Sequence, residues 1–271
     1  MIHDLDAATF RLPDGRYDVA VAGAGVAGIT LAIALAEQGQ RVALLEAGSL
    51  ELSAQSQALY DGRSTGQPYA ELTFARLRFL GGTSNHWGGW SRPLDRGDLD
   101  PRPWIPHAGW PIPKAQLDRY LPAARDVLEL SPVRPDRRLG ELPEPFDEVA
   151  FHFDPPVRMR EKYLGALTVS RRIDLLVNAN LVDIETDGDS GRVTGFLVRG
   201  YQPEAPVRRI AAGAYVLALG GIETPRALLL GDRVRGRAIG NDRDLVGRFF
   251  MEHPTYDLGH FAVRRGRFPG R

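Results

Sequence analysis

The stretch YDVAVAGAGVAGITLAIALAEQGQRVALLE, residues 17–46, decides the fold. Its first six residues form a short apolar run that is typical of a buried parallel strand. A turn of the form GxGxxG follows at Gly23, Gly25 and Gly28, and the apolar segment after it is typical of a helix that ends near a glycine. A second apolar strand is expected over 41–46. The stretch therefore predicts a βαβ unit within an α/β protein.

The same stretch predicts a dinucleotide site. Gly23 permits the tight turn, Gly25 lets the backbone approach a pyrophosphate, and Gly28 lets the helix pack closely on the strand. The helix N-terminus directs free N–H groups at the anion. Glu46 ends the second strand, where a carboxylate accepts hydrogen bonds from ribose hydroxyls. The turn does not separate FAD from NAD, and a glycine-rich turn without a ligand is the simpler alternative.

Composition narrows the class of protein. The 271 residues carry 34 basic and 34 acidic side chains, so there is no basic footprint for nucleic acid or a membrane surface. The absence of cysteine excludes disulfides, thiolate chemistry and cysteine-ligated metal centres, and we expect no metal site. We find neither a membrane-spanning apolar run nor the apolar core of a signal peptide, and we expect a cytoplasmic protein.

Glycine is dense again in LGGTSNHWGGW, residues 80–90, where the backbone is expected to pass close to a ligand. Residues 93–145 then hold 11 of the 20 prolines, which predicts a lid or arm over 93–150 with one helix at 114–130. Strand patterns return from about 168, and the alternation over 191–199 is typical of an antiparallel strand. A buried strand over 214–219 precedes Gly220 and a helix that we expect to begin with Thr224 as its N-cap and Pro225 as its first residue.

These patterns divide the chain into four parts. We expect the first part of a cofactor-binding domain over 1–92, the proline-rich arm over 93–150, the second part of the cofactor-binding domain over 151–250 and the start of a substrate-binding domain over 251–271.

The chain resembles the N-terminal half of a glucose–methanol–choline (GMC) flavoprotein oxidoreductase. Five stretches carry the resemblance in the family's order: residues 17–48, LGGTSNHWGGW, WPIPKAQLDRYLPAARDVL, LALGGIETPRALLL and LVGRFFMEHP. The His–Trp pair and the GGIETPR form are similar to the bacterial sugar-oxidising branch, which includes pyranose oxidases. The resemblance implies a Rossmann-like FAD-binding domain, with a parallel sheet, helices and antiparallel strands.

The resemblance also implies the residues that bind FAD. In pyranose oxidase-like members a histidine at the position of His86 is bonded to the 8α-methyl carbon of the flavin. The alternative is that His86 only packs on the ring or hydrogen-bonds locally. The backbone of Thr83, Ser84 and Asn85 would follow the isoalloxazine, and that of Leu181 would contact the adenine. The full expected set is Gly23, Gly25, Gly28, Glu46, Ala47, Gly82, Thr83, Ser84, Asn85, His86, Trp87, Leu181 and Gly220.

The implied chemistry is oxidation of an alcohol group of a sugar or glycoside, with hydride transfer to flavin N5. The family's base is a histidine near the C-terminus of longer chains, and this chain ends after an expected strand over 256–265. None of the other histidines matches the catalytic motif: His3, His107, His152, His253 and His260. We therefore expect no catalytic residue in this chain and a second chain that supplies the substrate domain and the base. The alternatives are a truncated or degenerate flavin-binding protein without turnover and, more remotely, an NAD-dependent Rossmann dehydrogenase.

Overall fold

A five-stranded parallel sheet lies at the centre of the protein. The computed structural model describes residues 1–13, 15–132, 150–188, 190–231, 236 and 238–253. The strand order is β1-β4-β3-β2-β8. The strand bounds are β1 Ile2–Asp4, β2 Tyr17–Ala22, β3 Val42–Leu45, β4 Ile173–Val177 and β8 Ala212–Leu217. The βαβ unit predicted from residues 17–46 therefore forms the β2–β3 pair, with Val19 opposite Val42 and Ala22 opposite Leu45.

A second, antiparallel sheet covers one face of the first. Its order is β5-β6-β7, with bounds Asn180–Thr186, Val193–Arg199 and Arg208–Ile210. Alternate residues of β2 and β3, such as Ala20, Ala22 and Leu45, bury against Phe196 and Ile210 of this sheet. The predicted fold class, a parallel sheet with helices and additional antiparallel strands, is confirmed.

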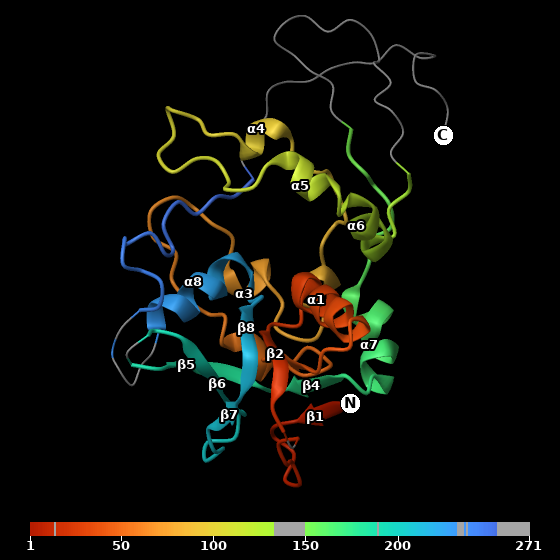
Figure 1. Ribbon diagram of the computed structural model, residues 1–271, viewed down its shortest axis with the longest axis vertical. Helices are drawn as coiled ribbons and strands as arrows, with labels where there is room; N and C mark the ends of the chain where they lie inside the picture. Colours follow the sequence, from red (N-terminus) through yellow and green to blue (C-terminus); the bar gives the residue numbers. More distant parts are fainter. Residues whose placement is uncertain (14, 133–149, 189, 232–235, 237, 254–271) are drawn as a thin grey trace, which may run out of the picture.

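Two helices, α1 (Val26–Glu37) and α7 (Met159–Val169), cover the opposite face of the parallel sheet. The intervening residues of β2 and β3, Val21, Val42 and Leu44, bury against Ile29 and Leu167 of these helices. Because successive side chains of a strand point to opposite faces, one apolar run supplies both cores. Three layers result, and Figure 1 shows α1 and α7 together on one side of β2.

The remaining helices lie mostly above the C-terminal ends of the strands, and all of them except α8 are shorter than α1 and α7 (Figure 1). Their bounds are α2 Ala54–Ala58, α3 Leu72–Ala75, the 3-10 helix η1 Gly82–Asn85, α4 Arg96–Leu99, α5 Lys114–Asp118, α6 Leu121–Leu128 and α8 Gly220–Leu230. Each described helix is too short or too polar to cross a membrane.

Two helix expectations were wrong. The helix expected over 114–130 is two helices, because Pro122 has no N–H and in one continuous helix its ring would meet the carbonyl of Asp118. The helix expected to begin at Pro225 begins at Gly220 instead, three residues after the end of β8 at Leu217. Pro225 lies inside α8, where it removes one hydrogen bond and does not mark the helix start.

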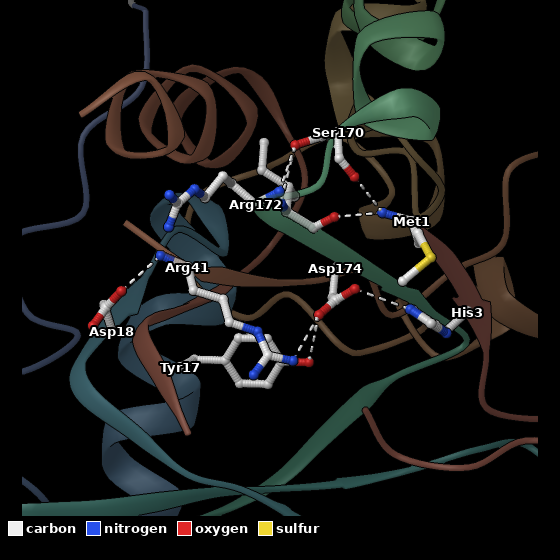
Figure 2. A network of polar contacts seen from close by, with 9 residues as sticks. Met1, His3, Tyr17, Asp18, Arg41, Ser170, Arg172 and Asp174 are labelled. Atoms are coloured by element: carbon white, nitrogen blue, oxygen red, sulfur yellow. Dashed lines mark hydrogen bonds and ion pairs between the residues drawn. The ribbon is translucent and has the colours of Figure 1, made fainter. Parts of the chain in front are cut away.

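A polar network holds the N-terminal end of the parallel sheet (Figure 2). Asp174 of β4 is buried and accepts a hydrogen bond from the Tyr17 hydroxyl at 3.0 Å. Its carboxylate also lies 3.1 Å from the His3 ring and 3.4 Å from the Arg41 guanidinium. The network joins β1, β2, β4 and the residue before β3, so it ties four neighbouring strands at the end opposite the site described below. The strand expected over 256–265 and His260 lie outside the described residues.

Candidate functional site

A cavity of about 540 Å³ opens where the C-terminal ends of β2, β3 and β8 meet β5 and α8. Ala22, Leu45 and Leu217, the last residues of the three parallel strands, all contribute to its wall. Ligands of open α/β sheets bind at this edge, because the loops that follow the strands converge there. The volume is within the range of sites for small molecules and cofactors.

The N-terminus of α1 faces this cavity without a side-chain cap. Gly25 is the N-cap residue, and Val26 and Ala27 also line the cavity. The first N–H groups of a helix have no partner within the helix and carry its positive dipole end. The arrangement can therefore bind an anion such as a phosphate.

The three glycines of the turn lack a side chain for different reasons. A Cβ on Gly23 would lie 2.4 Å from the carbonyl oxygen of Ala218, and one on Gly28 would lie 1.8 Å from the carbonyl oxygen of Gly23. Both are therefore required by close packing inside the protein. A Cβ on Gly25 would meet nothing within 4 Å, and its φ of −86° suits any residue. The protein alone does not explain Gly25, whereas a group bound against the helix N-terminus does.

Glu46 lies beside this turn and is 6% exposed. Its carboxylate accepts hydrogen bonds from the backbone N–H of Gly48 at 2.8 Å and of Ala24 at 3.2 Å. Burial raises the pKa of Glu46, opposed by these two amides and by the nearby Arg78 guanidinium. The carboxyl group is thus fixed in place at the cavity wall, with the geometry of an acceptor for hydroxyl groups.

Arg78 and Tyr60 complete this end of the cavity. Arg78 donates to the side chain of Asn180 at 2.8 Å and to the Ser56 hydroxyl at 3.2 Å, and it also bonds the Tyr201 hydroxyl. Burial, followed by the neighbouring Glu46, raises the pKa of Tyr60 to about 12. The phenol is therefore neutral at physiological pH, and Arg78 supplies a positive charge near Glu46.

The glycine-rich loop 80–90 contacts the first turn directly. The N–H of Gly81 donates to the carbonyl of Ala24 at 2.8 Å, and a Cβ on Gly82 would lie 3.4 Å from the Cα of Gly25. Gly82, Thr83 and Ser84 line the cavity. Two glycine-rich segments that are separate in the sequence therefore form adjacent parts of one wall.

The side chains of the next three residues of the loop make local hydrogen bonds. Asn85 donates from its side chain to the carbonyls of Leu80 and Gly82, and the Trp87 indole donates to the carbonyl of Val157. His86 is exposed, and its two ring nitrogens lie 3.0 Å from the Thr83 carbonyl and 3.2 Å from the Phe74 carbonyl. None of these three is among the described residues that line the cavity.

The other expected residues are placed as follows. Ala47, Leu181 and Gly220 line the cavity with Gly23, and Gly28 lies beneath the turn. Sequence reasoning did not single out Tyr60, Arg78, Glu223 and Arg226, which also line it. Tyr60 and Arg78 lie in loops outside the motifs, whereas Glu223 and Arg226 lie within the GGIETPR stretch, to which the sequence assigned no binding role beyond that of Gly220. The folded chain brings all four residues to one wall. An ion pair of 2.7 Å joins Arg76 to Glu223 and connects the segment after α3 to α8.

An uncapped helix N-terminus, a glycine without a packing role, a buried acceptor and a second glycine-rich loop fit a flavin dinucleotide. The chain belongs to the FAD binding domain family, whose model matches residues 18–242. FAD is therefore its cofactor.

Individual proteins show more local similarity. Over 81 residues the chain is 40% identical to the fructose dehydrogenase large subunit of Gluconobacter japonicus, an alignment that covers 30% of this chain and 14% of that protein. Over 63 residues it is 44% identical to one of the subunits of the anaerobic glycerol-3-phosphate dehydrogenase of Pectobacterium carotovorum, which covers 21% of this chain and 15% of that one.

Among solved structures, pyridoxine 4-oxidase from Mesorbium loti has a similar fold. The TM-score is 0.52 at 20% identity, with 80% of this chain and 52% of the oxidase covered. The chain thus spans about half of the oxidase, and the similarity is one of fold.

Proposed function

We propose that this chain is the FAD-binding part of a GMC-type oxidoreductase that oxidises an alcohol group of a sugar or glycoside. The observation that carries the proposal is the cavity itself, in which the Gly25 turn, Glu46 and the loop residues Gly82 to Ser84 form one wall. When bound, FAD supplies flavin N5 as the acceptor of the hydride that leaves the alcohol carbon.

The residues of this chain have distinct parts in the proposal. The α1 N-terminus and Gly25 receive the pyrophosphate, Glu46 accepts hydrogen bonds from the ribose hydroxyls, and the backbone of Leu181 contacts the adenine. The backbone of Thr83, Ser84 and Asn85 would follow the isoalloxazine, and Ala47 and Gly220 would contribute backbone at the cavity wall. Gly23 and Gly28 shape the turn.

The substrate class is supported by the similar proteins. Fructose, glycerol 3-phosphate and pyridoxine, the compounds in their names, all carry alcohol groups. Two of these proteins are named as subunits, which supports a second chain that completes the site with a substrate domain and the catalytic histidine.

The test uses purified, FAD-loaded protein under anaerobic conditions. Sugars, glycosides and simple alcohols are added to the chain alone and then together with the product of the adjoining gene, and flavin bleaching is followed at visible wavelengths. We expect slow bleaching by the chain alone and fast bleaching with the partner, because a positioned base contributes roughly 10²–10⁴ in rate. Fast bleaching by the chain alone would contradict the need for a partner. No bleaching in either mixture would identify a flavin-binding protein without turnover.

We also propose that His86 contacts the flavin, either as a bonded ligand or through packing. The mass of the acid-denatured polypeptide is measured by mass spectrometry, with His86→Ala as the matched variant. Added mass that disappears in the variant supports the bond. Unmodified mass leaves the contact, which then requires the substitution to shift the flavin spectrum; an unchanged spectrum would contradict both forms.

A further inference from the structure

The glycine-rich loop is held from behind by a segment about 70 residues away in the chain. The Trp87 indole N–H donates to the carbonyl of Val157 at 2.9 Å. The N–H of Met159, the first residue of α7, donates to the Ser84 hydroxyl at 3.1 Å. Val157 and Met159 are buried, so water does not compete freely for these two bonds.

Arg158, between these two residues, makes the most direct connection. One of its guanidinium nitrogens, Nη1, donates to the carbonyl oxygen of Ser84 at 2.7 Å and to that of Trp87 at 2.9 Å. These carbonyls flank Asn85 and His86, so a single charged donor spans the turn on which His86 is carried. Hydrogen bonds from a charged donor are roughly twice as strong as neutral ones.

We propose that Arg158 is a positioning residue for the flavin: it fixes the backbone around His86 and acts on the cofactor only through the loop. Arg158 is not among the described residues that line the cavity, whereas Gly82, Thr83 and Ser84 of the same loop are. The proposal rests on the placement of the isoalloxazine against this loop.

The test compares Arg158→Met, Arg158→Lys and a matched control, Arg172→Met, in the FAD-loaded protein. Arg172 also donates to a backbone carbonyl, that of Gly39 at 2.7 Å, but lies at the end of the sheet away from the cavity. Three quantities are measured: hydrogen exchange of loop 81–90, the visible flavin spectrum, and the dissociation constant for sulfite, which adds to the flavin.

In Arg158→Met we expect exchange in the loop to rise about tenfold or more, because two charged hydrogen bonds that hold it closed are lost. The spectrum and the sulfite constant shift with it. Lysine restores part of the effect, since its ammonium group reaches one carbonyl more easily than two. Arg172→Met leaves all three quantities as in the unmodified protein.

Unchanged exchange, spectrum and sulfite binding in Arg158→Met would overturn the proposal, even if the protein became less stable. If Arg158→Met does not fold, Arg158→Lys carries the test. Its loop exchange and flavin spectrum must then shift relative to Arg172→Met for the proposal to stand. None of these measurements uses an alcohol, so a failure here is distinct from a failure of the proposed oxidation.

Discussion

At the scale of single residues, Gly25 and Gly28 are two glycines of one motif that are required for different physical reasons. Gly28 is required because the helix touches the preceding turn, whereas Gly25 borders open space. The spacing in the sequence predicts both roles, since the motif encodes strand, turn and helix together. The motif assigns Gly25 to the ligand and Gly28 to close packing, and the short distance from a Gly28 Cβ to the Gly23 carbonyl agrees with the second assignment.

We expect Gly25→Ala to keep its fold and lose FAD, since the new methyl group occupies the space at the helix N-terminus and nothing in the protein opposes it. Gly28→Ala should instead destabilise the FAD-free protein by about 3 kcal/mol or more, in the range of severe overpacking. Urea unfolding and FAD titration of both variants check this. Equal losses of stability in the two variants would contradict the distinction.

Glu46 gives a prediction about pH. Its pKa is raised in the folded protein from a reference value of 4.5, so its contribution to stability is present below pH 4.5 and is lost as the pH rises through the raised pKa. We expect the unfolding free energy of the FAD-free protein to fall over that window, by about 1.4 kcal/mol for every pH unit that separates the folded pKa from the unfolded one. Glu46→Gln should lack this component. A variant whose pH profile is parallel to that of the unmodified protein would show that Glu46 does not titrate in this way.

At the scale of elements, the sequence predicted β2, α1 and β3 well because one continuous stretch carries their complete pattern. It missed β1, a three-residue edge strand, and α7, whose only buried residues are Met159 and Leu167. Both elements depend on long-range packing against β4 and α1, which a local pattern does not contain. The sequence did not predict the roles of Arg78 and Arg158 for the same reason, because their partners come from distant segments.

The network at Asp174 allows the stability of the N-terminal end of the parallel sheet to be tested separately from the cavity (Figure 2). Asp174→Ala should lower the free energy of unfolding by about 3 kcal/mol, because the buried Tyr17 hydroxyl loses its acceptor and a buried charge cluster is broken. Asp174→Asn, which keeps an acceptor oxygen, should cost about 1 kcal/mol.

Asp18→Asn is the control, since Asp18 is exposed and accepts only from the Arg41 backbone N–H among the bonds in Figure 2. Its cost should stay within about 0.5 kcal/mol. FAD affinity of the folded molecules should be unaffected in all three variants. Weak FAD binding in a stable Asp174 variant would show that the N-terminal end of the sheet and the cavity are coupled.

At the scale of the whole molecule, the cavity is assembled from both sheets and from α1, η1 and α8. A ligand that contacts all of these stabilises the folded state by mass action. With free FAD at 100 times its dissociation constant, the gain is about 2.7 kcal/mol. For a domain of this size we expect the unfolding temperature to rise by roughly 5–10 °C. Gly25→Ala serves as the control and should show no such rise; an equal rise would place FAD elsewhere.

The pairing of β2 with β8 has a consequence for the biogenesis of the protein. Tyr17 lies opposite Ala212, so β2 acquires one of its two neighbours almost 200 residues later. At about 5–20 residues per second, roughly 10–40 s of translation separate the two strands. During that interval the nascent chain exposes one unpaired edge of β2 and lacks the wall that α8 provides. We expect FAD to bind only after α8 has emerged from the ribosome, because the cavity lacks that wall until then.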